Sequence, residues 1–175
     1  MNRRGMLISL AVVGLIGHCA TGIAVAQEKQ RVSMKTPAEN TKYTQQVFID
    51  VGDAPGHQVR VYEIHRTYPS NPPMFNGVKL VEGWTRGTSD YTDTNGVTTG
   101  YTVNVLENGD KFFERYSCIA QNFGAGKFTA SCVGPITGGT GKFAGIRGVD
   151  RTVVAFDPKA GFNETQAEIE YWMEK

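Results

Sequence analysis

The chain has 175 residues, of which 40% are hydrophobic and 20% are charged, and its formal net charge is +1. This length and composition are those of a single globular domain with a hydrophobic core. Because the charge is near zero and no basic run stands out, the sequence argues against a nucleic-acid-binding protein.

Residues 1–26 have the pattern of a cleaved signal peptide. Arg3 and Arg4 precede an uncharged, largely apolar run that ends in the sequence AVA at residues 24–26. A basic start, an apolar centre and a small-residue site predict export with cleavage after Ala26. Glycines interrupt the run, so we predict no membrane span after cleavage. The arginine pair fits both the general and the twin-arginine route, and we expect a periplasmic or secreted protein.

The rest of the chain divides into a polar segment and a β-rich segment. Residues 27–55 carry no sustained hydrophobic period, so we predict a polar leader or linker, with at most a short strand at 47–51. From His57 onward, short runs of β-branched and aromatic residues alternate with glycine turns, three of them Asn-Gly. We therefore predict an all-β domain at residues 56–175, an antiparallel meander with enough strands to close a barrel.

The C-terminal segment, residues 163–175, fits two kinds of element. Asn163 and Gln166 fit the capping box of a helix. Against this, apolar or small residues alternate with glutamates and other polar residues from Thr165 to Glu174. This period of two favours a strand.

Two cysteines lie in the predicted domain, Cys118 and Cys132. They flank the turn sequence FGAG, and pairing two strands around that turn places them opposite each other on a hairpin. In an exported protein this favours a structural disulfide. The Cys-x-x-Cys spacing of redox pairs is absent, and only His57 and His65 accompany the thiols, so we predict no metal site.

The stretch GGTGKFAGIRG at residues 138–148 has the glycine content of a phosphate-binding loop. As a P-loop it fails, because Phe143 follows the lysine where Ser or Thr is needed and Ile136 stands in place of the first glycine. A dinucleotide fingerprint needs a helix where this sequence predicts a strand. We expect a structural turn between two strands, and no cofactor.

The segment TGGTGKFAGIRG at residues 137–148 resembles the signature shared by allene oxide cyclases and dirigent proteins. VYEIHRTYPSNPP at residues 61–73 and GVTTGYTVNV at residues 96–105 make the cyclases the closer match. The resemblance covers about residues 59–157. It implies an eight-stranded antiparallel barrel with an apolar interior that cyclises an unsaturated fatty-acid epoxide without a cofactor, in subunits that commonly form a homotrimer.

The resemblance also implies site residues. Glu63 corresponds to the family's glutamate, which helps open the epoxide by stabilising positive charge. Pro72 corresponds to the proline that helps hold an ordered water. His65 stands where the family has a water-binding asparagine, and Asn71 where it has the serine before the proline.

Two further pocket positions differ from the family. Thr102 replaces a cysteine, and Ile136 replaces a tyrosine. Because these pocket residues differ, we expect the family's barrel architecture to apply to this chain more closely than its substrate does.

The residue pattern of the first barrel strand also points to Glu63, without the resemblance. Val59, Val61, Glu63 and His65 share one face of the strand. If that face lines the barrel, Glu63 and His65 form an acid–base or cation-stabilising pair among aliphatic neighbours. There are two alternatives. Glu63 and His65 could form a purely structural contact at the rim of the barrel, or the opposite face of the strand could line the interior.

Three functions follow from this reading. The first is an exported, cofactor-free cyclase or isomerase that acts on a lipid-derived or phenolic substrate through Glu63 and His65, with Asn71, Pro72, Thr102 and Ile136 around the substrate. The second is a non-catalytic, dirigent-like or ligand-binding protein that takes up a small hydrophobic molecule. The third is a disulfide-stapled structural module with a filled interior.

Overall fold

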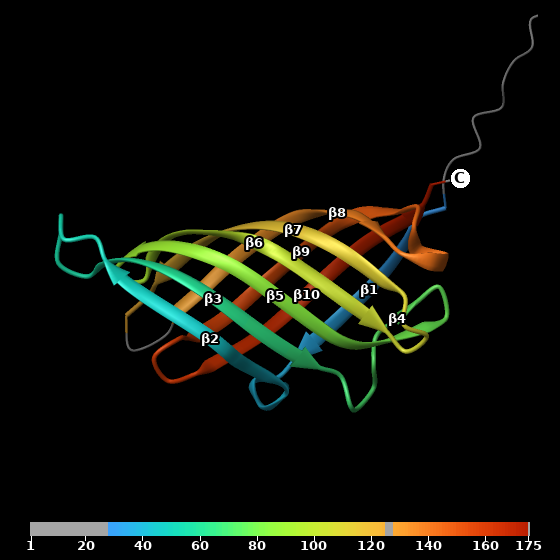
Figure 1. Cartoon of the computed structure of the whole chain (residues 1–175), viewed down its shortest axis with the longest axis horizontal. Coiled ribbons are helices and arrows are strands. Elements are labelled where there is room, and N and C mark those ends of the chain that lie inside the picture. The colour runs from blue at the N-terminus through green and yellow to red at the C-terminus, as the bar shows by residue number, and fades with distance from the viewer. Residues whose placement is uncertain (1–27, 125–127, 175) are drawn as a thin grey trace, which may run out of the picture.

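The computed structural model describes residues 28–124 and 128–174. The predicted signal peptide lies outside the described residues. Ten strands form one antiparallel sheet that curls into a barrel (Figure 1). The strands are β1 (Gln30–Thr36), β2 (Thr41–Asp50), β3 (His57–Thr67), β4 (Met74–Phe75), β5 (Val78–Thr92), β6 (Asn95–Leu106), β7 (Lys111–Asn122), β8 (Phe128–Gly139), β9 (Ile146–Asp157) and β10 (Phe162–Met173).

The strand order is β1-β10-β9-β8-β7-β6-β5-β3-β2, and β4 pairs only with β5. The predicted all-β antiparallel barrel is confirmed, but the strand number of eight is wrong, and strand pairing does not close the sheet into a full ring. Side chains bridge the seam between β2 and β10: Asn163 Nδ2 donates to Tyr43 Oη at 3.2 Å. Within the described ranges, no helix is long and apolar enough to cross a membrane.

Residues 27–55 contribute two full strands to the sheet, where the sequence predicts a polar leader with at most a short strand at 47–51. β1 pairs with β10, and β2 pairs with β3. Val32 and Met34 of β1 pack against the core and Thr36 is buried, whereas its exposed side chains reach polar partners on β10, as in the Arg31–Glu170 ion pair at 3.1 Å. An edge strand this short and this polar carries too little alternation to be recognised from sequence.

The C-terminal segment forms β10, as its alternation predicts, and the helix alternative is wrong. Asn163, Thr165, Ala167, Ile169 and Tyr171 are all buried on its inner face.

The predicted hairpin with a disulfide is also confirmed. β7 and β8 pair in the expected register, Cys118 lies opposite Cys132 with a Cα–Cα distance of 4.0 Å, and the two form a disulfide.

We expect the double variant Cys118→Ser/Cys132→Ser to lose about 2–3 kcal/mol of unfolding free energy, because the cross-link restricts the unfolded chain. The two cysteines are 14 positions apart, so the closed loop is short and its effect moderate. Urea unfolding at constant pH measures the difference. The reduced wild-type protein serves as the control and should match the variant, and equal stability of the oxidised and reduced forms would contradict the prediction.

The glycine-rich stretch is a turn between β8 and β9, as predicted. It contains the 3-10 turn η2 (Gly141–Phe143), and Phe143 is fully buried. The Lys142 backbone N–H donates to Asp110 Oδ2 at 3.2 Å, so this turn binds a carboxylate of its own chain. A side chain at Gly141 would collide with the same carboxylate, and the φ of Gly141 is 52°, which explains the glycine there.

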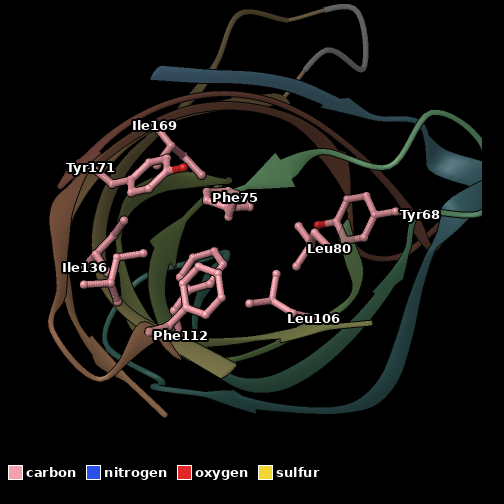
Figure 2. Close-up of a cluster of buried hydrophobic side chains, with 10 residues drawn as sticks. Tyr68, Phe75, Leu80, Leu106, Phe112, Ile136, Ile169 and Tyr171 are labelled. Carbon is pink, nitrogen blue, oxygen red and sulfur yellow. The ribbon is translucent and has the colours of Figure 1, made fainter. Parts of the chain in front are cut away.

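Large apolar side chains close one end of the barrel (Figure 2). We call this cluster the plug; its members are Tyr68, Phe75, Leu80, Leu106, Phe112, Ile136, Phe143, Ile146, Ile169 and Tyr171. Phe75 from β4 packs against Phe112 and Tyr171, with ring centroids 4.7 Å and 5.3 Å apart. A smaller cluster around Phe156 and the disulfide lies nearer the other end. Between the two clusters, polar and charged side chains lie among apolar ones.

Candidate functional site: a polar cavity inside the barrel

A cavity of about 100 Å³ lies inside the barrel. One water molecule needs roughly 10–15 Å³ on this scale, so the space suits a small organic molecule. Residues from every strand except β4 line it, among them Arg60, Arg66, Glu114 and Asp150. The expectation of an apolar interior is therefore wrong, because this barrel encloses two guanidinium groups and two carboxyl groups.

Strand alternation puts these charged groups inside. On β7, Glu114 shares its face with Phe112 and Cys118, and all three are buried. On β9, Asp150 shares its face with Ile146 and with Phe156. Each carboxyl group therefore enters the barrel because its apolar neighbours two or more positions away must be buried.

Glu114 and Asp150 are only 7% and 8% exposed. Burial raises the pKa of Asp150 to about 6, against the opposing effects of the Thr152 hydroxyl and Arg66. Burial, reinforced by the Asp150 carboxyl, raises the pKa of Glu114 well above its usual range, against the opposing effects of Asn104 and Arg66. Each carboxyl group therefore holds its proton more strongly than it would in water, and charge on Asp150 further raises the pKa of Glu114.

Thr152 and Arg66 orient this part of the cavity. Thr152 Oγ1 lies 2.9 Å from both oxygens of Asp150 and donates its proton to the carboxylate. Arg66 donates to Thr85 Oγ1 at 2.7 Å and to Asn163 Oδ1 at 3.0 Å, both neutral acceptors.

Three buried polar atoms of the cavity have no hydrogen-bond partner within the described part of the chain. They are Arg66 Nε, Asn104 Nδ2 and Glu114 Oε1. A buried polar atom without a partner costs about 1–3 kcal/mol. Asn104 still lies close enough to Glu114 to lower the pKa of that group, so Arg66 Nε is the atom among the three that most clearly calls for an oxygen acceptor from a guest.

A pair of tyrosines forms another wall of the cavity. Tyr62, Gly87, Gly100 and Tyr116 lie in one row across β3, β5, β6 and β7. The two hydroxyl groups meet at 2.7 Å above the glycines. A Cβ at Gly87 or Gly100 would lie 2.3 Å from Tyr116 Oη, so the contact requires glycine at both positions.

The structure places Glu63 and His65 on the outer face of β3, because Tyr62 and Ile64 occupy the inner face. The Thr44 hydroxyl bonds to Glu63 at 2.7 Å and Arg86 pairs with it at 2.8 Å, and together they lower the pKa of Glu63. His65 stacks on Trp84 with ring centroids 4.0 Å apart. The condition for an interior Glu–His pair is thus not met, and a catalytic role for either residue stays a prediction.

The other predicted substrate contacts are scattered. Thr102 lines the cavity and shares a 3.0 Å hydrogen bond with Thr85. Ile136 belongs to the plug. Asn71 and Pro72 lie in the loop between β3 and β4, and neither residue lines the cavity.

Sequence reasoning missed the charged residues of the cavity. For Glu114 and Asp150 a signal exists, since each lies on the apolar side of an alternating strand. For Arg60 and Arg66 there is none, because β3 carries apolar and charged residues on both faces.

Similarity to known proteins is found in the fold and not in the sequence. No protein-family model matches the sequence, and no curated protein matches it. The solved structure of the pterocarpan synthase dirigent protein PsPTS1 is similar with a TM-score of 0.49 at 13% identity, over 85% of this chain and 97% of that one. The pterocarpan synthase dirigent protein GePTS1 has a TM-score of 0.47 at 15% identity, over 97% and 98%. Pyocyanin demethylase has a TM-score of 0.41 at 19% identity, over 79% and 99%. Identities this low carry no residue roles over to this chain.

Proposed function

We propose that the protein encloses a small molecule with an oxygen function inside its barrel, and either isomerises it by proton transfer with Asp150 and Glu114 or cyclises it while the same two groups stabilise the developing charge. One observation supports this most. The carboxyl pair lies in the same cavity as three unpartnered polar atoms, on Arg66, Asn104 and Glu114 itself. Buried carboxyl groups with displaced pKa values in a cavity are typical of acid–base sites.

The roles follow from protonation. The Asp150 carboxylate removes a proton from a carbon next to the substrate's carbonyl or epoxide group, while the protonated Glu114 gives its proton to another atom of the substrate. The substrate gains and loses one proton, so the net change is an isomerisation, and proton exchange within the pair restores the starting state. Arg66 and Asn104 donate hydrogen bonds to the oxygen on which negative charge develops. General acid–base catalysis of this kind contributes about 10²- to 10⁴-fold in rate.

An unstable allene oxide, the substrate that the sequence resemblance implies, provides the test. The wild-type protein should convert it to a cyclopentenone enriched in one enantiomer. Asp150→Asn and Glu114→Gln should return the product towards the racemate, because the buried carboxyl groups no longer stabilise the charges that develop as the epoxide opens and the ring closes inside the barrel. Glu63→Gln, on the outer face, is the matched carboxyl control and should keep the enrichment.

The outcomes separate the proposals for this chain. Racemic product from the wild-type protein overturns the cyclase proposal for this substrate. Enrichment lost only in Glu63→Gln moves the site to Glu63, the residue to which the sequence prediction assigned the chemistry, although that prediction expected it inside the barrel.

A second candidate function is ligand binding without chemistry. It is favoured by the apolar wall that Ala130, Phe156 and the disulfide form beside the cavity. Organic extraction of the purified protein followed by mass spectrometry tests it. A stoichiometric ligand that the protein returns chemically unaltered supports binding, whereas an empty barrel counts against it.

A further inference from the structure

Arg60 is a second buried arginine that the proposed chemistry does not use. It projects inward from β3 and is 5% exposed. It lies away from the plug, towards the end of the barrel at which β3 begins. Together with Tyr91 it lines both the cavity and an adjoining hollow of about 200 Å³ at that end. Arg60 therefore stands where a ligand would pass between the barrel end and the interior.

Arg60 has no counter-charge. Its Nε donates to Ser89 Oγ and its Nη1 to Gln46 Oε1, each at 3.2 Å, and both acceptors are neutral. No ion pair of the described chain includes Arg60. Burying a charge without an opposite charge is costly, and arginine cannot give up its proton to avoid that cost.

Aromatic rings surround the guanidinium. Its Cζ lies 4.4 Å from the centroid of the Tyr62 ring and 5.7 Å from those of Tyr43 and Phe48. These contacts offset part of the cost and hold the guanidinium plane in place. They leave its charge unneutralised.

The acidic groups of the hollow do not neutralise Arg60. Asp157 accepts hydrogen bonds from the backbone N–H groups of Lys159 and Ala160, at 3.0 Å and 3.1 Å. Asp93 is exposed and lies over Gly56, in the loop before β3. Neither makes an ion pair with Arg60.

We propose that Arg60 binds the carboxylate of the ligand, whose apolar body lies in the barrel against Tyr91, Tyr116 and Phe156. The inference rests on the proposed function only in placing the ligand in the same cavity, and it names the ligand class, a small aromatic or aliphatic acid. One carboxylate neutralises one guanidinium, and its two oxygens match the planar fork of arginine. Strand pairing places Glu114 in the same cross-strand row as Ile64. Arg60 lies four residues before Ile64 on β3, so the two rows are roughly 13 Å apart. A ligand anchored at Arg60 would thus extend towards the carboxyl pair.

The test compares phenylacetate with phenylacetamide, which has the same body without the charge. Isothermal titration calorimetry should show that the wild-type protein binds phenylacetate more tightly than the amide. Arg60→Gln should weaken phenylacetate binding about 10- to 100-fold, the loss expected for a hydrogen bond to a charged group, and leave the amide unchanged. Arg115→Gln, an exposed arginine of β7, is the control and should change neither.

Three results would overturn the assignment. One is an unchanged affinity for phenylacetate in a folded Arg60→Gln protein. Another is an equal loss for the acid and the amide, which would show that Arg60 only shapes the barrel. The last is a wild-type protein that binds no phenylacetate at millimolar concentration.

A second variant covers the case in which Arg60→Gln does not fold. Arg60→Lys keeps the charge and loses the fork, and it should still bind the acid more tightly than the amide, though more weakly than the wild type does. An Arg60→Lys protein with no preference for the acid contradicts the assignment. Acid binding that depends on Arg60, together with a racemic product in the allene oxide experiment, would leave this inference standing while the proposed catalysis fails.

Discussion

Asp150→Asn is expected to raise the free energy of unfolding at pH 8 by on the order of 3 kcal/mol and to change it little at pH 4. The folded-state pKa of Asp150, about 6, lies above its ordinary value of 3.8. Between these two values the folded protein holds a proton that the unfolded chain releases, so stability falls as the pH rises. Above pH 6 the full cost of the buried carboxylate is present, and asparagine avoids it. Urea unfolding at both pH values measures the effect.

Asp50→Asn is the control for this experiment. Asp50 is exposed at the end of β2 and accepts a hydrogen bond from Gln58 at 2.7 Å. Its substitution should alter stability by no more than about 0.5 kcal/mol at either pH. Equal destabilisation by Asp150→Asn at pH 4 and pH 8 would mean that the Asp150 side chain supports the fold whatever its protonation state, and would contradict the prediction.

This prediction bears on function as well as on stability. An ionised carboxylate that destabilises the folded state is expected to be retained only where the activity depends on it. Asp150→Asn should therefore move stability and enantiomeric enrichment in opposite directions. A purely structural carboxyl group would move both downward.

Gly100→Ala is expected to cost about 3 kcal/mol of unfolding free energy or more, or to prevent folding, because overpacking without room to relax is at the upper end of such costs. The added Cβ would lie 2.3 Å from the Arg86 carbonyl oxygen and 2.3 Å from Tyr116 Oη. The carbonyl belongs to the paired strand β5 and cannot move away without disrupting the sheet. Thermal and urea unfolding measure the loss.

Thr99→Ala provides the matched control. Thr99 precedes Gly100 on β6, and its side chain is exposed on the outer face. The substitution should change stability by no more than about 0.5 kcal/mol. If Gly100→Ala is tolerated as well as Thr99→Ala, the close packing of Tyr62 and Tyr116 over the glycines is not required for the fold.

The class of fold was predictable because strand alternation and turn residues are local properties. The Asn-Gly turns, the period of two in β10 and the spacing of Cys118 and Cys132 each depend on a few neighbouring residues. The number of strands was harder to predict from the sequence. β1 is short and mostly polar, and its assignment depends on polar partners from β10 that lie more than a hundred residues away.

The candidate site was less predictable, because it depends on which face of β3 turns inward. Both faces of β3 combine apolar and charged residues, so the strand's own alternation does not choose between them. Packing chooses: Tyr62 finds room over Gly87 and Gly100 and meets Tyr116, while Glu63 finds Thr44 and Arg86 outside.

By itself, the amino-acid sequence determined the antiparallel β-architecture, the disulfide hairpin and the structural nature of the glycine turn at residues 138–148, since each depends on residues close together in the chain. Only the tertiary structure decided that Glu63 and His65 face outward and that Arg60, Arg66, Glu114 and Asp150 share one cavity. Those four residues come from three strands, and only the register between the strands brings them together. Their charges and protonation states arise from burial, which is a property of the assembled barrel and not of any segment.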